Sequence, residues 1–306
     1  MEKRKIIFIV NPFSGTGSKK NVPRLIEHSV RNSGGGGLRG GYEILFTEKP
    51  GHATAISKKA KKDGVNIVVA VGGDGTVNEI AKELVNTDTK LGIIPTDSGN
   101  GLARELKIPL KINKSIRLLD NCNVSQIDSC TINGNPFFNT AGTGIDAHVA
   151  RLYAEGKKRG FKAYFDIVLS EFFKYKPQHY EIEIDSPPTK VGGKKYFKRK
   201  AMLVSLANGS QYGNNIYLSP GADIKDGLVD VCILKPFPKS RVVEFVYRIF
   251  NHTIYSFKYF EMFKAKEVTI KREHPGTVHL DGEPVEMGKE LVVSVVPKSL
   301  KVLVPV

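Results

Sequence analysis

Residues 66–84 constrain the fold of this chain more than any other stretch of its sequence. Residues 66–71 form a short apolar run rich in β-branched side chains, which is typical of a strand buried on both faces. Residues 72–75 read Gly-Gly-Asp-Gly, and apolar residues then recur at helical spacing. Thr76 and Glu79 are spaced as in a capping box, which places Thr76 at the N-cap of the helix. The stretch therefore predicts a strand, a tight turn and a helix.

The predicted turn is suited to bind an anion. Glycine lets a ligand approach the backbone closely, and the first turn of the helix offers free N–H groups at the positive end of its dipole. Asp74 adds a carboxylate, which is expected if a metal ion or a nucleotide hydroxyl lies there with the phosphates. A tight turn that binds nothing is the alternative. Residues 72–79 match neither a Walker A loop nor the Gly-x-Gly-x-x-Gly of dinucleotide folds.

Similar units surround this stretch. Apolar runs at residues 6–10, 42–46 and 91–95 have the composition of buried strands, and each is followed by a loop and a helical pattern. Residues 1–126 are therefore predicted to form an α/β domain with a parallel sheet. Open sheets of this kind bind ligands at the carboxyl ends of their strands, where the glycine-rich loops of this chain fall.

The sequence changes character after residue 126. Alternating polar and apolar residues predict strands, with a single long helix at residues 161–174. The predicted strands cover residues 126–132, 136–141, 180–184, 200–207, 228–234, 267–271, 277–280, 291–296 and 300–304. Residues 127–299 are therefore predicted to form a mainly-β domain, a sandwich or a barrel.

Composition narrows the class of protein. The chain has 306 residues and a net charge of +15, which suits an anionic partner such as a nucleotide or a membrane surface. Its three cysteines show no metal-binding or disulfide spacing, which indicates a reducing compartment. Because no apolar run approaches the length of a membrane span or a signal peptide, we expect a cytoplasmic protein that is peripheral to the membrane.

Residues 72–79, together with Asn-Pro-Phe-Ser-Gly at residues 11–15, resemble the diacylglycerol kinase catalytic family, which includes sphingosine and ceramide kinases. The Gly-Gly-Asp-Gly core also occurs in NAD kinases and phosphofructokinases, but NAD kinases do not usually show the first motif in this form. The resemblance implies an NAD kinase- or diacylglycerol kinase-like first domain, to which residues 300–306 return. It implies that ATP is bound by Asn11, Pro12, Ser14, Gly15, Thr47, Gly72, Gly73, Asp74, Gly75, Thr76, Asn78, Glu79, Ser98 and Asn100.

Residues 95–104 match the next motif of the family with two departures. Asp97 stands where the family usually has glycine, and Gly101 stands where it usually has aspartate. The loss of an aspartate at Gly101 removes one polar contact to nucleotide or metal, for which Asp97 is the candidate substitute. The sequence Ser-Gly-Asn at residues 98–100 is more similar to that of the sphingosine and ceramide kinase branch of the family. Asp146 is similar in position to a family residue near the lipid headgroup, while a helix cap is its equally favoured alternative.

Two further motifs carry acidic residues. Residues 220–230 resemble a family segment that holds a structural Mg²⁺, which by position implies Asp223, Asp226 and the carbonyl of Leu228 as ligands. Residues 279–284 contain the Asp-Gly-Glu motif of the family, which implies Asp281 or Glu283 as the base that deprotonates the acceptor hydroxyl. The alternative for both segments is an ordinary turn at Asp-Gly.

Taken together, these motifs predict an ATP- and Mg²⁺-dependent lipid kinase. It would transfer the γ-phosphoryl group to a primary hydroxyl of diacylglycerol or a related lipid at an anionic membrane surface. Three alternatives stay open: a sphingoid-base or ceramide kinase, a soluble-substrate kinase such as NAD kinase, and a non-catalytic nucleotide- or membrane-binding module. We expect no nucleic-acid partner, and the sequence leaves a homodimer open.

Aromatic residues in two segments bear on the lipid. Residues 161–174 and 242–263 are rich in them, as expected of core packing, of an acyl-chain groove or of a membrane-facing surface. The basic clusters at residues 157–159 and 194–200 are candidates for anionic headgroups, with solvated loops as the alternative.

Overall fold

The computed structural model describes residues 5–14, 21–32, 41–97, 99–156, 160–186, 193–213 and 216–306. The chain forms two compact units. Unit 1 consists of Met1–Ile127 and Lys298–Val306, and unit 2 consists of Asp128–Pro297. Two strands, β5 (Cys122–Ile132) and β16 (Glu290–Pro305), therefore each contribute residues to both units.

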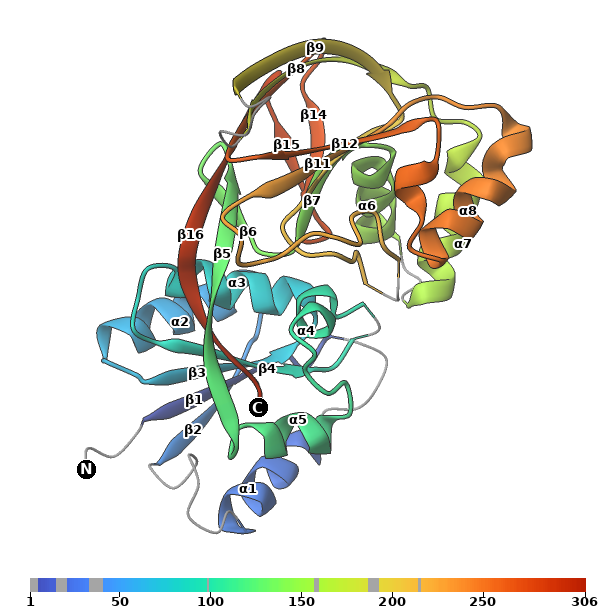
Figure 1. Ribbon diagram of the computed structural model, residues 1–306. Coiled ribbons are helices and arrows are strands. Elements are labelled where there is room, and N and C mark those ends of the chain that lie inside the picture. The colour runs from blue at the N-terminus through green and yellow to red at the C-terminus, as the bar shows by residue number, and fades with distance from the viewer. Residues whose placement is uncertain are drawn as a thin grey trace. The chain divides into compact units, whose positions relative to one another are not determined.

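Unit 1 is an α/β domain, as predicted. Its elements are β1 (Ile6–Val10), α1 (Val22–Asn32), β2 (Tyr42–Phe46), α2 (His52–Lys62), β3 (Ile67–Gly72), α3 (Asp74–Leu84), β4 (Lys90–Pro95), α4 (Gly101–Glu105) and α5 (Ile112–Leu118). The parallel strands run in the order β2-β1-β3-β4. Helices α2 and α3 cover one face of this sheet, and α1 and α5 cover the other (Figure 1). Every residue of β1 and β3 is consequently buried, which explains their unbroken apolar sequence.

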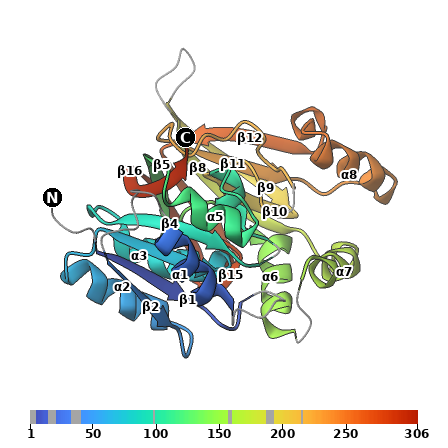
Figure 2. The same ribbon diagram turned by 90° about the horizontal axis from the view of Figure 1, so that it is seen from below.

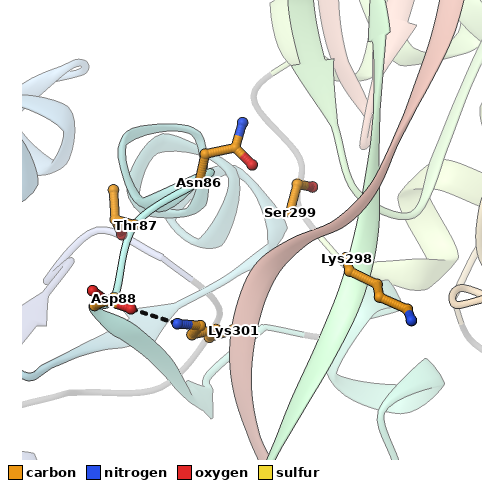
Figure 3. A pocket seen from close by; sticks show the side chains of 6 residues that line it. All are labelled: Asn86, Thr87, Asp88, Lys298, Ser299 and Lys301. Atoms are coloured by element: carbon orange, nitrogen blue, oxygen red, sulfur yellow. Dashed lines mark hydrogen bonds and ion pairs between the residues drawn. The ribbon is translucent and has the colours of Figure 1, made fainter.

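The segment Lys298–Val306 completes unit 1. Val302 pairs with Leu91 of β4 in parallel, and Leu303 is buried in the core of the unit. Ahead of β4, the backbone N–H of Asn86 donates to the carbonyl of Ser299 at 2.7 Å. Lys301 pairs with Asp88 at 2.6 Å, and this hydrogen bond lowers the pKa of the Asp88 carboxyl (Figure 3).

Unit 2 is a β-sandwich, which confirms the predicted class of the second domain. One antiparallel sheet has the order β12-β11-β10-β7-β14-β15, and the other contains β13, β8, β9 and the first part of β16. The bounds are β6 (Asn135–Phe137), β7 (Thr140–Gly144), α6 (Ile145–Glu155), α7 (Phe161–Phe172), β8 (Gln178–Ser186), β9 (Gly193–Ala201), β10 (Leu203–Ala207), β11 (Val229–Leu234), α8 (Val242–Phe250), β12 (Phe260–Ala265), β13 (Glu267–Arg272), β14 (Gly276–Leu280) and β15 (Glu283–Met287).

An apolar core lies between the two sheets of this sandwich. Ile182 of β8 and Ile270 of β13 pack in one cluster with Val204 of β10 and Val231 of β11, and all four are fully buried. The alternating sequence of β8 places every second side chain in this cluster, which is the pattern of a sheet with one buried face. Within the described ranges, every helix is too short or too polar to cross a bilayer.

Candidate active site

The loop after β1 is tied to the glycine-rich turn after β3 through Asn11. Its side-chain amide donates from Nδ2 to Oγ1 of Thr76 at 2.9 Å, and its Oδ1 accepts the backbone N–H of Phe13 at 2.9 Å. Its own backbone N–H donates to the carbonyl of Val71 at 3.0 Å. Asn11 therefore connects two predicted phosphate-binding loops through its contacts with Thr76 and Val71, and it fixes the turn of its own loop through Phe13.

Hydroxyl groups extend this connection to the loop after β4. Oγ of Ser14 lies 2.9 Å from Oγ1 of Thr96, and the backbone N–H of Thr96 donates to the carbonyl of Gly72 at 3.0 Å. Thr47, at the end of β2, is buried and donates its backbone N–H to the carbonyl of Val10 at 2.9 Å. The described parts of the loops that follow these four strands thus lie at one edge of the sheet, where ligands bind in this class of fold.

Two carboxylates lie against the glycines of this edge. A Cβ atom at Gly73 would fall 2.8 Å from Oδ2 of Asp97, and a Cβ at Gly99 would fall 3.0 Å from Oδ2 of Asp74. Larger residues at these two positions would therefore displace a carboxylate. Asn100, which is 4% exposed, adopts a left-handed conformation with φ 49° and exchanges hydrogen bonds with the backbone of Asp97. Its amide holds the loop in place.

The predicted capping box at Thr76 and Glu79 is wrong. Helix α3 begins at Asp74, with Gly73 in an extended conformation at the N-cap. The carboxylate of Glu79 instead accepts the backbone N–H groups of Gly51 at 3.1 Å and of Thr54 at 3.2 Å, at the start of α2. Glu79 therefore caps a neighbouring helix, and its predicted contact with ATP stays a prediction.

Not every residue that we predicted to bind a ligand falls within the described ranges. Gly15, Ser98 and the basic cluster 157–159 lie outside the described residues. A pocket of about 310 Å³, lined by Asn86, Thr87, Asp88, Lys298, Ser299 and Lys301, lies ahead of the first residue of β4 (Figure 3). It belongs to the end of the sheet opposite to the glycine-rich loops, so we do not assign the nucleotide to it.

In unit 2, Asp281 holds a turn. Oδ2 of Asp281 accepts the backbone N–H of Phe138 at 2.9 Å, and Oδ1 accepts those of Asn139 at 2.8 Å and Thr140 at 3.0 Å. Asp281 and Gly282 have φ of 50° and 89°, which is the two-residue hairpin turn with both residues left-handed. The Asp-Gly pair of the motif thus meets the demand of this turn, and the carboxylate fastens it to the start of β7.

Glu283 is in a different position. It is the first residue of β15, where it pairs with Leu280, and its side chain is exposed. The same short motif therefore presents one carboxylate bound by three backbone donors and a second one that solvent can reach.

Asp146 is buried beside His279. Oδ2 of Asp146 lies 3.1 Å from Nε2 of His279, and both side chains are less than a tenth exposed. Nδ1 of His279 accepts the backbone N–H of Gly282 at 3.4 Å, which leaves Nε2 as the donor to Asp146. A Cβ atom at Gly142 would clash with the same Oδ2, so a larger residue there would displace the carboxylate of Asp146.

A tyrosine completes this cluster. The hydroxyl of Tyr212 donates to Oδ2 of Asp146 at 3.4 Å and contacts Oγ of Ser205. Burial, together with the charge of Asp146, raises the pKa of Tyr212 well above its ordinary value, so it stays protonated. The sequence did not indicate His279, Ser205 or Tyr212 as partners of Asp146. The only available signal was the position of His279, two residues ahead of the Asp-Gly-Glu motif.

Comparison with known proteins gives these features a family. The model described as diacylglycerol kinase catalytic domain matches residues 5–132, and that described as YegS C-terminal NAD kinase beta sandwich-like domain matches residues 139–304. This chain belongs to the diacylglycerol kinase family of lipid kinases. The family resemblance of residues 11–15 and 72–79 is therefore confirmed, and so is the prediction of a phosphotransferase.

Individual relatives of this lipid kinase cover nearly all of it. The diacylglycerol kinase of Bacillus subtilis is 28% identical, with 92% of this chain and 90% of that protein aligned. A Pseudomonas aeruginosa protein named "Probable lipid kinase YegS-like" is 30% identical, with 86% and 84% aligned. The crystal structure of a diacylglycerol kinase from Bacillus anthracis has the same fold, with a TM-score of 0.73 at 21% identity over 98% of this chain and 96% of that one.

The loop predicted to hold a structural Mg²⁺ in this lipid kinase is built around an ammonium group. Oδ2 of Asp226 pairs with Nζ of Lys264 at 2.9 Å, and Oδ1 of the buried Asp230 lies 3.0 Å from the same Nζ. Oδ1 of Asp226 accepts the backbone N–H of Leu228 at 2.9 Å, and Oδ1 of Asp223 accepts that of Lys225 at 3.0 Å. Lys264 and these backbone N–H groups thus contact the carboxylates of the loop, and the ligation of Mg²⁺ by Asp223, Asp226 and Leu228 stays a prediction.

Proposed function

We propose that this lipid kinase transfers the γ-phosphoryl group of ATP to a primary hydroxyl of diacylglycerol or a closely related lipid. The observation that carries the proposal is the convergence of the loops after β1, β3 and β4 in unit 1. The turn at the start of α3 offers backbone N–H groups for phosphate oxygens. Ser14 and Thr96 add hydroxyls that lie 2.9 Å apart. These are the groups that the triphosphate of a nucleotide requires.

The carboxylates of Asp74 and Asp97 fit the metal that accompanies ATP. Both lie against glycines of the same loops, and carboxylate oxygens are the ligands that Mg²⁺ prefers. Mg²⁺ would enter with ATP and neutralise charge on the transferring phosphoryl group. The contribution of the chain itself is to position the phosphates and to keep this edge of the sheet rigid, which Asn11 does through its hydrogen bond to Thr76.

Glu283 is our candidate for the base. The acceptor hydroxyl must be able to reach the base, and the carboxylate of Asp281 is held in the turn, where both of its oxygens accept backbone N–H groups. The side chain of Glu283 is exposed on the adjacent residue of the hairpin. In the reaction, the hydroxyl oxygen bonds to the γ-phosphorus, the bond from that phosphorus to the leaving oxygen of ADP breaks, and the proton passes to Glu283.

The geometry favours diacylglycerol over a sphingoid base as acceptor. The predicted amine partner, Asp146, is buried and its carboxylate already contacts His279, Tyr212 and the backbone N–H of Ala147. An amine would have to displace those donors. A neutral acceptor needs no such counter-charge.

The test is an incubation of the purified chain with labelled ATP and Mg²⁺ and one acceptor at a time. The acceptors are diacylglycerol, monoacylglycerol, sphingosine, ceramide and NAD. We expect phosphorylation of diacylglycerol or its near relative, and loss of it in Asp74→Ala with an unchanged circular dichroism spectrum. Asp63→Ala, which changes an exposed aspartate at the end of α2, is the matched control. Undiminished turnover by Asp74→Ala, or phosphorylation of NAD alone, would contradict the proposal.

A further inference from the structure

Helix α8 is apolar on two sides. Its inner side chains, Phe245 and Ile249, are buried in the cluster that fills this end of unit 2. Its outer side chains, Val243, Tyr247 and Phe250, are 80%, 63% and 46% exposed. These three follow the spacing i, i+4 and i+7, so they form one stripe along the solvent side of the helix. A helix on the surface of a soluble protein normally has polar residues along this side.

Helix α7 adds a second exposed apolar stripe. Phe165 and Leu169, one helical turn apart, and Phe173, directly after the helix, are 38%, 45% and 49% exposed. The two helices are neighbours at one end of unit 2 (Figure 2). The rings of Phe172 and Phe245 stack with their centroids 6.2 Å apart, and Nζ of Lys239 lies 5.3 Å from the centroid of Phe173.

We refer to these two stripes jointly as the outer apolar surface, which consists of Phe165, Leu169, Phe173, Val243, Tyr247 and Phe250. Isolated exposed apolar side chains are normal on soluble proteins, but a group on two adjoining helices marks a surface that contacts something.

The charges beside this surface are mostly positive. Exposed Lys162 and Lys174 lie on or next to α7, and exposed Lys239, Arg241 and Lys258 flank α8 in the sequence. Two acidic side chains of the region are paired with cations. Glu244 binds Arg241 and Arg248 at 2.9 and 2.8 Å, and Glu171 binds Lys174 at 3.2 Å. Asp166 is the exposed carboxylate on α7.

We propose that the outer apolar surface inserts into the headgroup region of an anionic phospholipid bilayer, and that Lys162, Lys239 and Lys258 beside it contact lipid phosphates. Aromatic side chains flanked by Lys and Arg are the composition that binds such an interface in the plane of the membrane. A second copy of the chain fits less well, because association through this surface would bring the same cations face to face. The inference rests on the proposed function, since a lipid kinase must reach an acceptor that resides in a membrane.

Sedimentation with vesicles tests this surface. The vesicles contain phosphatidylglycerol and phosphatidylcholine, or phosphatidylcholine alone, and no nucleotide is present. We expect the wild-type chain to bind the anionic vesicles, and the double variant Tyr247→Ser/Phe250→Ser to bind them about 100-fold more weakly. Val292→Ser is the matched control, because Val292 is 43% exposed on β16 of the same unit and lies outside the basic cluster 194–200. It should bind as the wild type does.

A second measurement separates docking from folding and from catalysis. With a water-soluble short-chain diacylglycerol and no vesicles, the double variant should keep wild-type turnover and an unchanged circular dichroism spectrum. Equal vesicle binding by the double variant and the wild type would overturn the proposal. So would a wild-type dimer that the double substitution converts to a monomer without lipid. Vesicle binding by a chain that phosphorylates no lipid would refute the proposed function and leave the docking surface standing.

Discussion

Substitutions at Asp281 and Glu283 test whether the two carboxylates of one short motif have different roles, one structural and one catalytic. Asp281→Ala removes the acceptor of the backbone N–H groups of Phe138, Asn139 and Thr140, which lie 2.8–3.0 Å from its oxygens. Glu283→Gln keeps the size of an exposed side chain at the start of β15 and removes its charge. We expect the first change to act on stability and the second on turnover.

The size of the first effect follows from the contacts. Hydrogen bonds to a charged group contribute about 1.5–3 kcal/mol each, and donors that can reach water recover part of this, so we take about 3 kcal/mol for the three together. Alanine at a φ of 50° adds about 1 kcal/mol of backbone strain. A loss of about 4 kcal/mol corresponds to a Tm lower by roughly 8–16 °C for a unit of this size.

Calorimetry and a turnover assay on both variants measure the separation. Glu283→Gln should unfold within about 0.5 kcal/mol of the wild type. It should lower kcat by about 100- to 10,000-fold, which is the usual effect of removing a general base. Asp281→Asn, which keeps one acceptor oxygen, should fall between Asp281→Ala and the wild type in Tm. Wild-type Tm in Asp281→Ala would refute the structural role, and wild-type kcat in Glu283→Gln would refute the base.

Two further substitutions test the packing of each unit. Lys264→Met leaves Asp226 and the buried Asp230 without their cation and should lower the free energy of unfolding by about 2 kcal/mol, a figure reduced because the lysine is partly exposed. Burial opposes the charge of Lys264, but its hydrogen bonds to both aspartates raise its pKa. The stabilisation by the charged Lys264 should therefore be complete below pH 10.5 and be lost as the pH rises through its raised pKa. The stability of Lys264→Met should not change over this pH range. A wild-type Tm that falls on adding EDTA would instead reveal a metal at this loop. Leu303→Ala should lower the free energy of unfolding by about 3 kcal/mol through a cavity in the core of unit 1, whereas Val306→Ala, at a residue 79% exposed, should not, and equal denaturant midpoints for the two would show that Leu303 does not pack there.

Local sequence patterns predicted most of unit 1. The runs that became β1, β3 and β4 are apolar throughout because helices cover both faces of their sheet. The same patterns failed at Thr76, where the capping-box spacing was present but the glycine turn lets the helix begin at Asp74. The partner of Glu79 is on another helix, so no local spacing could indicate it.

Less of the candidate site in unit 2 could be predicted from the sequence. Asp146 and the Asp-Gly-Glu motif could be singled out, but the contact between Asp146 and His279 joins residues 133 positions apart. The motif also did not show which of its two carboxylates is held by hydrogen bonds, because the donors are the backbone N–H groups of residues 138–140. At residues 220–230 the acidic pattern predicted a metal, which stays a prediction, but it could not indicate that Lys264 pairs with Asp226 and Asp230, because Lys264 comes from a strand that no spacing rule connects to this segment.

The late position of Lys298–Val306 in the chain affects how unit 1 is made on the ribosome. Strand β4 pairs with β3 on one side and through Leu91 with Val302 on the other, so during synthesis its second edge stays open until this segment is translated. At about 5–20 residues per second the wait after residue 127 is roughly 10–30 s, in which all of unit 2 is made. A nascent chain thus presents an unpaired strand edge, which is a site for aggregation or for a chaperone. Unit 1 becomes complete only after all of unit 2 has been synthesised.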